Sequence, residues 1–189
     1  MASEYKIVYQ TLEDRDNLDK IEQEGPFLCG RSDAWLGTGY YFWESFIENA
    51  KWWGENNHQE KGYVITQAHY TNDEDKCFNL IDNPEHLRRF NEVISIMKKK
   101  GLYIPTKTTV SRIIMFLRSI DKFPFNATRA KGENCKSHTS EFSITTIFNQ
   151  KVPTIYLDSL PAIQVCFYRK GEPLDLSKYK IVFPEKYVL

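Results

Sequence analysis

The sequence predicts an α+β fold in which strands precede and follow a central pair of helices. Segments near both ends of the chain alternate apolar and polar residues, as half-buried strands do. Between them, apolar residues recur at the spacing of one helix face. Apolar residues make up 41% of the chain and charged residues 26%, which is ordinary for a folded domain. We expect one domain over residues 1–189, with a helical insertion at about 82–122.

Local signals place the elements of the first half. The strands expected there are Tyr5–Gln10, Gly37–Trp43, Gly62–Tyr70 and a short one at Cys77–Ile81. A short helix around Leu18 is expected to end at Gly25-Pro26. Ser45 followed by Glu48 has the spacing of a capping box, so a second helix is expected to begin at Ser45.

The central helices have clearer boundaries. Asn83-Pro84 is typical of a helix start, and the run from Lys98 to Gly101 is typical of a helix end. A further helix is expected over Thr108–Ile120. The polar stretch Phe125–Ser140 is expected to be an exposed loop. The remaining segments predicted as strands are Phe142–Phe148, Thr154–Leu157, Ile163–Tyr168 and Tyr179–Phe183.

Charge and cysteine content exclude several classes of protein. Basic and acidic residues number 25 each, so no overall positive field attracts nucleic acid or an anionic membrane. The four cysteines form no CxxC pair, so no metal site is expected. No signal peptide or apolar run of bilayer length is present, which favours a cytoplasmic protein without membrane contact. A toxin delivered without a leader would have the same sequence features.

The most informative segment is Trp35–Ser45, in which Gly37 and Gly39 precede a run of aromatic residues. Glycine permits positive φ and close approach of the backbone, while the aromatic side chains favour a half-buried strand. This combination suits a planar ligand stacked on a ring. A tight turn entering an aromatic core strand explains the same residues.

Familiar catalytic motifs are absent. Phe42 stands where a dinucleotide-binding fingerprint would have its third glycine, and the P-loop, GxSxG and HExxH patterns do not occur. The four histidines are isolated from one another along the chain. These observations disfavour a conventional hydrolase or metalloenzyme.

The order of the segments resembles the ADP-ribosyltransferase superfamily, in particular its diphtheria-toxin and poly(ADP-ribose) polymerase branch. The matching segments are Tyr9-Gln10-Thr11, Gly37-Thr38-Gly39-Tyr40-Tyr41-Phe42, Glu48-Asn49-Ala50-Lys51-Trp52 and Ile163–Tyr168. They cover roughly the first 70 and the last 30 residues, whereas residues 82–140 have no counterpart. The resemblance implies a split β-sheet core that binds nicotinamide adenine dinucleotide (NAD) in a cleft.

The resemblance also implies roles for individual residues. NAD, as substrate, would be bound by Gln10, Thr11, Gly37, Gly39, Tyr40 and Tyr41. Tyr41 would stack on the nicotinamide, and Gln10 would hydrogen-bond the adenosine ribose. The position of the catalytic glutamate falls at Gln164. In this family, a carboxylate stabilises the cation that develops as the nicotinamide–ribose bond breaks.

Two residues depart from the family pattern. Gln10 stands in place of the usual histidine, and Gln164 in place of the usual glutamate. A glutamine hydrogen-bonds but offers no carboxylate. A displaced carboxylate would compensate, with Glu141 as the first candidate and Glu44 as the second. The catalytic residues expected from the resemblance are therefore Tyr41, Gln164 and Glu141.

Three functions follow from these residues. The first is an NAD-dependent ADP-ribosyltransferase that modifies a protein or nucleic acid, as a toxin or phage or defence effector with a possible antitoxin partner. The second is a catalytically inactive module of the same fold that binds a nucleotide or a protein. The third is a nucleic-acid-binding factor whose basic residues would be Arg112, Arg118, Lys122, Arg129, Lys131 and Lys136.

Overall fold

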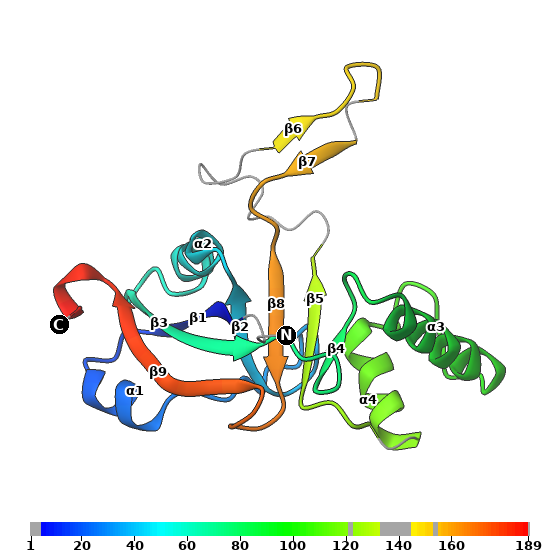
Figure 1. The fold of residues 1–189 in the computed structure, drawn as a ribbon, viewed down its shortest axis with the longest axis horizontal. Coiled ribbons are helices and arrows are strands. Elements are labelled where there is room, and N and C mark those ends of the chain that lie inside the picture. The colour runs from blue at the N-terminus through cyan, green and yellow to red at the C-terminus, as the bar shows by residue number, and fades with distance from the viewer. Residues whose placement is uncertain (1–4, 121–122, 133–144, 153–154, 189) are drawn as a thin grey trace.

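A mixed β-sheet forms the centre of the molecule (Figure 1). The computed structural model describes residues 5–120, 123–132, 145–152 and 155–188. Within these residues the sheet has seven strands, in the order β4 (Cys77–Asn79), β5 (Ala127–Lys131), β8 (Ile163–Phe167), β2 (Tyr40–Glu44), β1 (Tyr5–Glu13), β3 (Tyr63–Thr71) and β9 (Leu174–Phe183). Only β4 and β5 pair in parallel; the other neighbours are antiparallel.

Four helices accompany the sheet within the described residues. They are α1 (Leu18–Glu24), α2 (Ile47–Asn57), α3 (Pro84–Lys99) and α4 (Val110–Ile120). A 3₁₀ turn, η2 (Glu185–Tyr187), follows β9. The predicted α+β class is confirmed by this mixture of strands and helices. Among the described helices, none has the length and apolar character needed to cross a membrane.

The sheet consists of two halves that run in different directions. In Figure 1, β1, β3 and β9 run across the view, whereas β8 and β5 stand upright. β1 pairs with β3 along its whole length, from Tyr5 to Glu13, but with β2 only at Val8 and Tyr9. The two halves are therefore joined by a very short stretch of main-chain pairing.

Helices cover the sheet on both faces. Ala50 of α2 packs with Tyr9 and Trp43 on one face, and Ile21 of α1 packs with Leu12 beneath the other. The pair α3–α4 lies at the β4 end of the sheet (Figure 1). Its inner residues form one apolar cluster with Phe78 of β4 and include Val93, Met97, Ile113 and Leu117. The sequence predicts both of these helices at this place in the chain.

Helix boundaries agree with the sequence where a cap is formed. Asn83 Oδ1 accepts hydrogen bonds from the main-chain N–H groups of Glu85 and His86, both at 3.0 Å. The predicted start of α3 is thus confirmed. The prediction of a capping box at Ser45 is wrong. Ser45 has φ +66°, α2 begins at Ile47, and no side chain caps its first turn.

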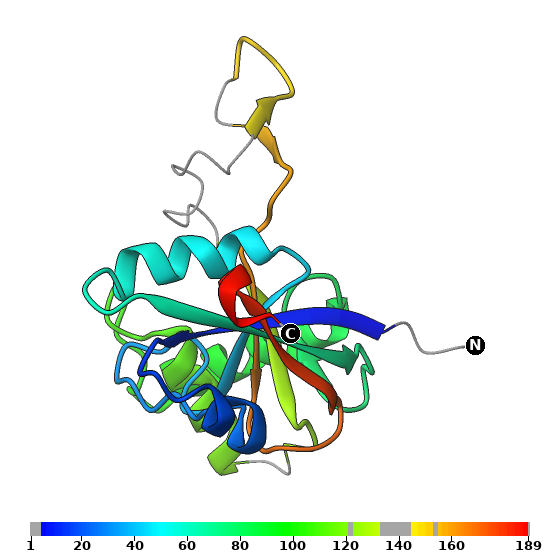
Figure 2. The ribbon, with the colours of Figure 1, turned by 90° about the vertical axis from the view of Figure 1, so that its left-hand side faces the viewer.

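The prediction of an exposed loop over Phe125–Ser140 is wrong for its first part, and residues 133–140 lie outside the described residues. Residues Ala127–Lys131 form β5, whose first three residues are buried. A separate hairpin of β6 (Thr145–Ile147) and β7 (Tyr156–Asp158) follows, and it stands away from the sheet (Figures 1 and 2). Residues 142–144 and Thr154, which belong to the strands predicted there, lie outside the described residues.

Candidate functional site

Strands β1, β2 and β8 bring several of the predicted residues onto one face of the sheet. Tyr41 is paired with Cys166, and Trp43 with Gln164. Directly paired residues share a face, and side chains two residues apart on a strand also share it. Tyr41 and Gln164 are therefore diagonal neighbours. We call this side of the three strands the Gln164 face.

Gln164 has an unusual environment for a buried amide. It is 7% exposed, and its Oε1 atom has no hydrogen-bond partner among the residues that the structure describes. A buried acceptor without a donor costs about 1 to 3 kcal/mol of stability. Buried polar groups are satisfied in most proteins, so an exception needs an explanation. A ligand that donates a hydrogen bond would supply the missing partner.

The four tryptophans of the chain gather around Trp43, which is the cross-strand partner of Gln164. Trp43 lies 6.2 Å from Trp35, 6.4 Å from Trp52 and 6.2 Å from Trp53, measured between ring centroids. Trp43 is buried, whereas Trp35 is 37% exposed. The cluster therefore extends from the core to the surface. The sequence analysis missed it because the rings come from a turn, a strand and a helix.

Tyr41 has a clear structural role. Its hydroxyl accepts a hydrogen bond from the N–H of Leu36 and donates one to the carbonyl of Gly37, both at 2.7 Å. Burial raises the pKa of this phenol. Gly37 has φ +88°, and a Cβ at Gly39 would collide with Cys166 Sγ. These contacts form the tight turn into a core strand that the sequence analysis gave as the alternative.

Gln10 lies on the opposite face from Tyr41 and Gln164. Its Nε2 donates to the carbonyls of Phe27 at 3.0 Å and Tyr41 at 3.3 Å, and its Oε1 accepts from the N–H of Phe27 at 2.9 Å. Its neighbour Thr11 lies on the Gln164 face. The hydroxyl of Thr11 donates to the carbonyl of Ala50 in α2 at 2.8 Å.

Tyr40 also falls on the opposite face, because it stands one residue from Tyr41 along β2. Its ring packs against the core cluster that contains Phe42. The ammonium group of Lys170 lies 5.8 Å from the ring centroid. The structure therefore brings Thr11, Tyr41 and Gln164 to one face and leaves Gln10 and Tyr40 on the other.

The opposite face holds a buried ion pair between Glu44 and Arg129. Arg129 Nε donates to Glu44 Oε2 at 2.7 Å, and Arg129 Nη2 donates to Glu44 Oε1 at 2.8 Å. Lys6 Nζ lies 3.1 Å from Glu44 Oε1, and the Tyr70 hydroxyl donates to Oε2. Burial acts to raise the pKa of Glu44, but Arg129, Tyr70 and Lys6 together hold it below the usual value.

These contacts bear on two expectations from the sequence. Both oxygens of Glu44 are engaged on the face away from Gln164, so Glu44 is not placed to supply a carboxylate there. Arg129 is buried in the ion pair and presents no charge to a nucleic acid. Among the other basic residues, Arg112 and Arg118 are exposed on α4, and Lys131 lies 4.0 Å from Asp158. Glu141, Lys122 and Lys136 lie outside the described residues.

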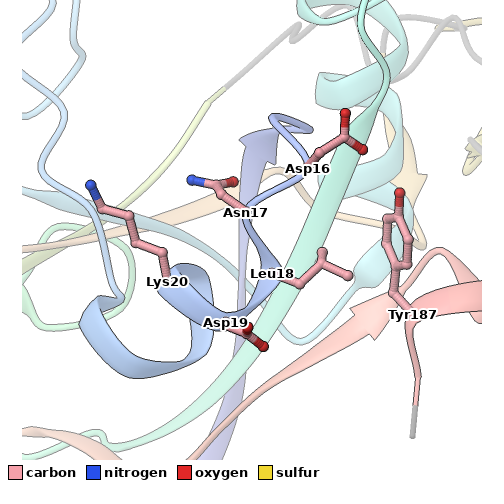
Figure 3. A pocket seen from close by; sticks show the side chains of 6 residues that line it. All are labelled: Asp16, Asn17, Leu18, Asp19, Lys20 and Tyr187. Atoms are coloured by element: carbon pink, nitrogen blue, oxygen red, sulfur yellow. The ribbon is translucent and has the colours of Figure 1, made fainter.

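Surface hollows lie elsewhere on the molecule. One of about 430 Å³ is lined by the start of α1, from Asp16 to Lys20, and by Tyr187 (Figure 3). Another of about 880 Å³ lies between the segment Thr71–Lys76 and the segment Gly171–Leu176. None of the predicted site residues lines either hollow. Within the described residues, no group of three or more His, Cys, Asp or Glu side chains is placed to hold a metal ion.

Comparisons of this chain with protein-family models, with curated proteins and with solved structures found no match. The residues of the Gln164 face and their surroundings are therefore the basis for a functional proposal.

Proposed function

We propose that this chain is an ADP-ribosyltransferase-like protein that binds NAD on the Gln164 face and modifies a macromolecular acceptor. The observation that carries the proposal is the unpartnered Oε1 of Gln164, buried beside Trp43 and diagonal to Tyr41. Gln164 is also the residue at which the family resemblance expects contact with the substrate. Two independent arguments, one from sequence and one from hydrogen bonding, thus select the same side chain.

The residues on this face fit the chemistry of NAD. The nicotinamide and adenine rings are planar, and indole and phenol rings bind planar groups by stacking. The carboxamide and the ribose hydroxyls are hydrogen-bond donors of the kind that Gln164 Oε1 lacks. Tyr41 and Trp35, the exposed ring beside Trp43, would stack against a ring, and Gln164 would accept a hydrogen bond. The bound dinucleotide would supply the ADP-ribosyl group.

Gln10 has a positioning role under this proposal. Its amide is satisfied by the main chain of Phe27 and Tyr41, so it has no free group for a ribose. By binding the carbonyl of Tyr41 it fixes the strand that carries the Tyr41 ring. Its effect on NAD would therefore be indirect, through the placement of β2.

A second candidate function is NAD binding without transfer. Gln164 carries no negative charge, and both oxygens of Glu44 are occupied on the other face. Transfer to an acceptor would need a carboxylate from another part of the chain, for which Glu141 is the candidate. Without that carboxylate, the Gln164 face would bind the dinucleotide and leave it intact.

Isothermal titration of the protein with NAD tests the binding step. The wild-type chain is expected to release or absorb heat, and Gln164→Leu to weaken binding at least about tenfold, the worth of one hydrogen bond to a buried group. Gln23→Leu is the matched control, because Gln23 is exposed on α1. The absence of binding by the folded wild-type protein, or equal binding by Gln164→Leu, would contradict the proposal.

Incubation with labelled NAD and cell lysate separates the two candidate functions. Label that becomes attached to protein or nucleic acid supports the transferase. Binding in the titration with no label transferred supports the binding module. Gln164→Leu serves as the background control in both arms.

A further inference from the structure

Positive charge is concentrated in one part of the chain despite its zero net charge. Residues 93–120 contain six basic residues and no acidic residue: Lys98, Lys99, Lys100, Lys107, Arg112 and Arg118. The remainder of the chain accordingly holds nineteen basic and twenty-five acidic residues. We call residues 93–120 the basic segment. It comprises the second half of α3, the connection that follows, and α4.

The charges of the basic segment are available to a partner. All six side chains are exposed, and within the described residues none of them lies within 4.0 Å of a carboxylate oxygen. Lys98 and Lys99 at the end of α3 also stabilise that helix through its dipole. Arg112 lies in the first turn of α4, where a positive charge opposes the dipole and no acidic residue compensates. Helix stability therefore does not account for the whole set.

Aromatic rings hold three of these cations in place without neutralising them. Lys98 lies 5.1 Å from the Tyr103 ring and Lys100 lies 5.9 Å from the Phe116 ring, measured from Nζ to the ring centroid. The guanidinium carbon of Arg118 lies 4.2 Å from the centroid of Tyr168. Because a ring carries no net charge, the positive charge of each cation remains available to bind an anion.

The basic segment borders the Gln164 face. Ile114, on the inner side of α4, packs with Leu36 and Cys166, and Tyr41 packs against the same cluster. Tyr168, which lies beneath Arg118, follows β8 directly and contacts this cluster as well. An anionic polymer bound along α4 would therefore lie next to the strands on which NAD is proposed to bind.

We propose that the basic segment is a docking surface for a nucleic acid, which would be the acceptor of the transfer. The choice of acceptor depends on the proposed function, whereas the docking itself does not. Cations accompanied by aromatic rings are typical of surfaces that bind phosphates and bases together. Lys98 and Lys99 end α3, Lys100 and Lys107 lie in the connection, and Arg112 and Arg118 lie on α4, which spans about 16 Å. Cations spread over such a length suit a chain of repeating phosphates. An acidic protein and an anionic membrane are the alternatives that the test must distinguish.

Fluorescence anisotropy with a labelled twenty-nucleotide single strand, in the absence of NAD, tests the docking. The wild-type protein is expected to bind, and Lys99→Glu/Lys107→Glu/Arg112→Glu to bind at least about thirtyfold more weakly. The plot of log affinity against log salt concentration is expected to become shallower by about 2 in this variant, since three phosphate contacts are lost. The matched control is Lys151→Glu/Lys178→Glu/Lys180→Glu, which makes the same charge change at exposed lysines elsewhere.

Each outcome decides the proposal. Loss of binding in the first variant, with binding retained in the control, supports it. Equal loss in both variants would show a nonspecific charge effect and overturn it. Binding of the wild type to phosphatidylserine vesicles or to polyglutamate but not to the oligonucleotide would overturn it as well. None of these binding measurements contains NAD. Failure of NAD binding in the titration would therefore leave the nucleic-acid docking result unaffected.

Discussion

Gln10 and Gln164 are both buried glutamines, with exposures of 4% and 7%, yet their amides have opposite environments. Gln10 uses its amide nitrogen and its oxygen to bind the main chain of Phe27 and Tyr41. Gln164 leaves its oxygen without a donor. Burial alone therefore does not distinguish an amide that the fold satisfies from one that leaves an acceptor free for a ligand. The hydrogen bonds that are missing are more informative than those that are formed.

The same contrast holds for the two faces of the sheet around these residues. The Gln10 side carries the ion pair of Glu44 with Arg129, in which both carboxylate oxygens are bonded. The Gln164 side carries tryptophan rings and an unsatisfied acceptor. We expect substitutions on the first side to change stability, and substitutions on the second to change ligand binding.

The largest effect is expected for Arg129→Met. Removal of one partner leaves Glu44 buried without its main counter-charge, which costs about 3 to 5 kcal/mol. Urea unfolding measures the change in the free energy of unfolding. Arg88→Met is the control, because Arg88 is exposed on α3. A loss below about 1 kcal/mol would show that the ion pair contributes little to the fold.

The pH dependence of stability sharpens this result. The pKa of Glu44 is lower in the folded chain than in the unfolded chain, so its contribution is present above the unfolded pKa. That contribution is lost as the pH falls through the folded pKa. In Arg129→Met the cation that most lowers this pKa is absent, so the acid-induced loss is expected to be smaller than in the wild type. An unchanged pH dependence would show that other carboxylates cause the acid-induced loss of stability.

A smaller loss is expected for Gln10→Leu. The substitution leaves the N–H and the carbonyl of Phe27 without their partner, which costs about 2 to 3 kcal/mol. NAD affinity would fall less than in Gln164→Leu, because Gln10 acts only by positioning β2. Combined unfolding and titration experiments check both expectations. Full stability with loss of NAD binding would instead make Gln10 a direct ligand.

The smallest change in stability is expected for Gln164→Leu. Leucine has a similar size and no unsatisfied acceptor, so the free energy of unfolding should stay the same or rise by about 1 kcal/mol. NAD binding should weaken at least about tenfold at the same time. A drop in stability like that of Gln10→Leu would mean that the Gln164 amide supports the fold, and the contrast between the two glutamines would disappear.

Local sequence signals were sufficient for much of the fold. The strand near Gly62–Tyr70 alternates side chains, and Asn83 caps its own helix, so both were predictable from neighbouring residues. β5 was not predictable, because a charged residue such as Arg129 in a polar stretch normally indicates a solvent-exposed segment. Its partner Glu44 lies far away along the chain, and only the sheet brings the two together.

The candidate site was predictable only in part, because its residues also come from distant parts of the chain. Tyr41 and Gln164 came from the family resemblance, and they do lie on one face because β2 pairs with β8. The orientation of Gln10 depends on its hydrogen bonds with Phe27, which no local pattern indicates. The unpaired oxygen of Gln164 becomes evident only when all surrounding donors are in place.

The main-chain contacts between β1 and β2 are the pairing at Val8 and Tyr9 and one hydrogen bond from the N–H of Ser45 to the carbonyl of Ile7 at 2.9 Å, and side chains add further contacts across this boundary. The bonds that cross it run from Gln10 to the carbonyl of Tyr41, and from Lys6 and Tyr70 to Glu44. The angle between the two halves of the sheet therefore depends on side-chain length and charge. Single substitutions at Gln10, Lys6 or Tyr70 are therefore expected to change that angle while the strands within each half keep their pairing.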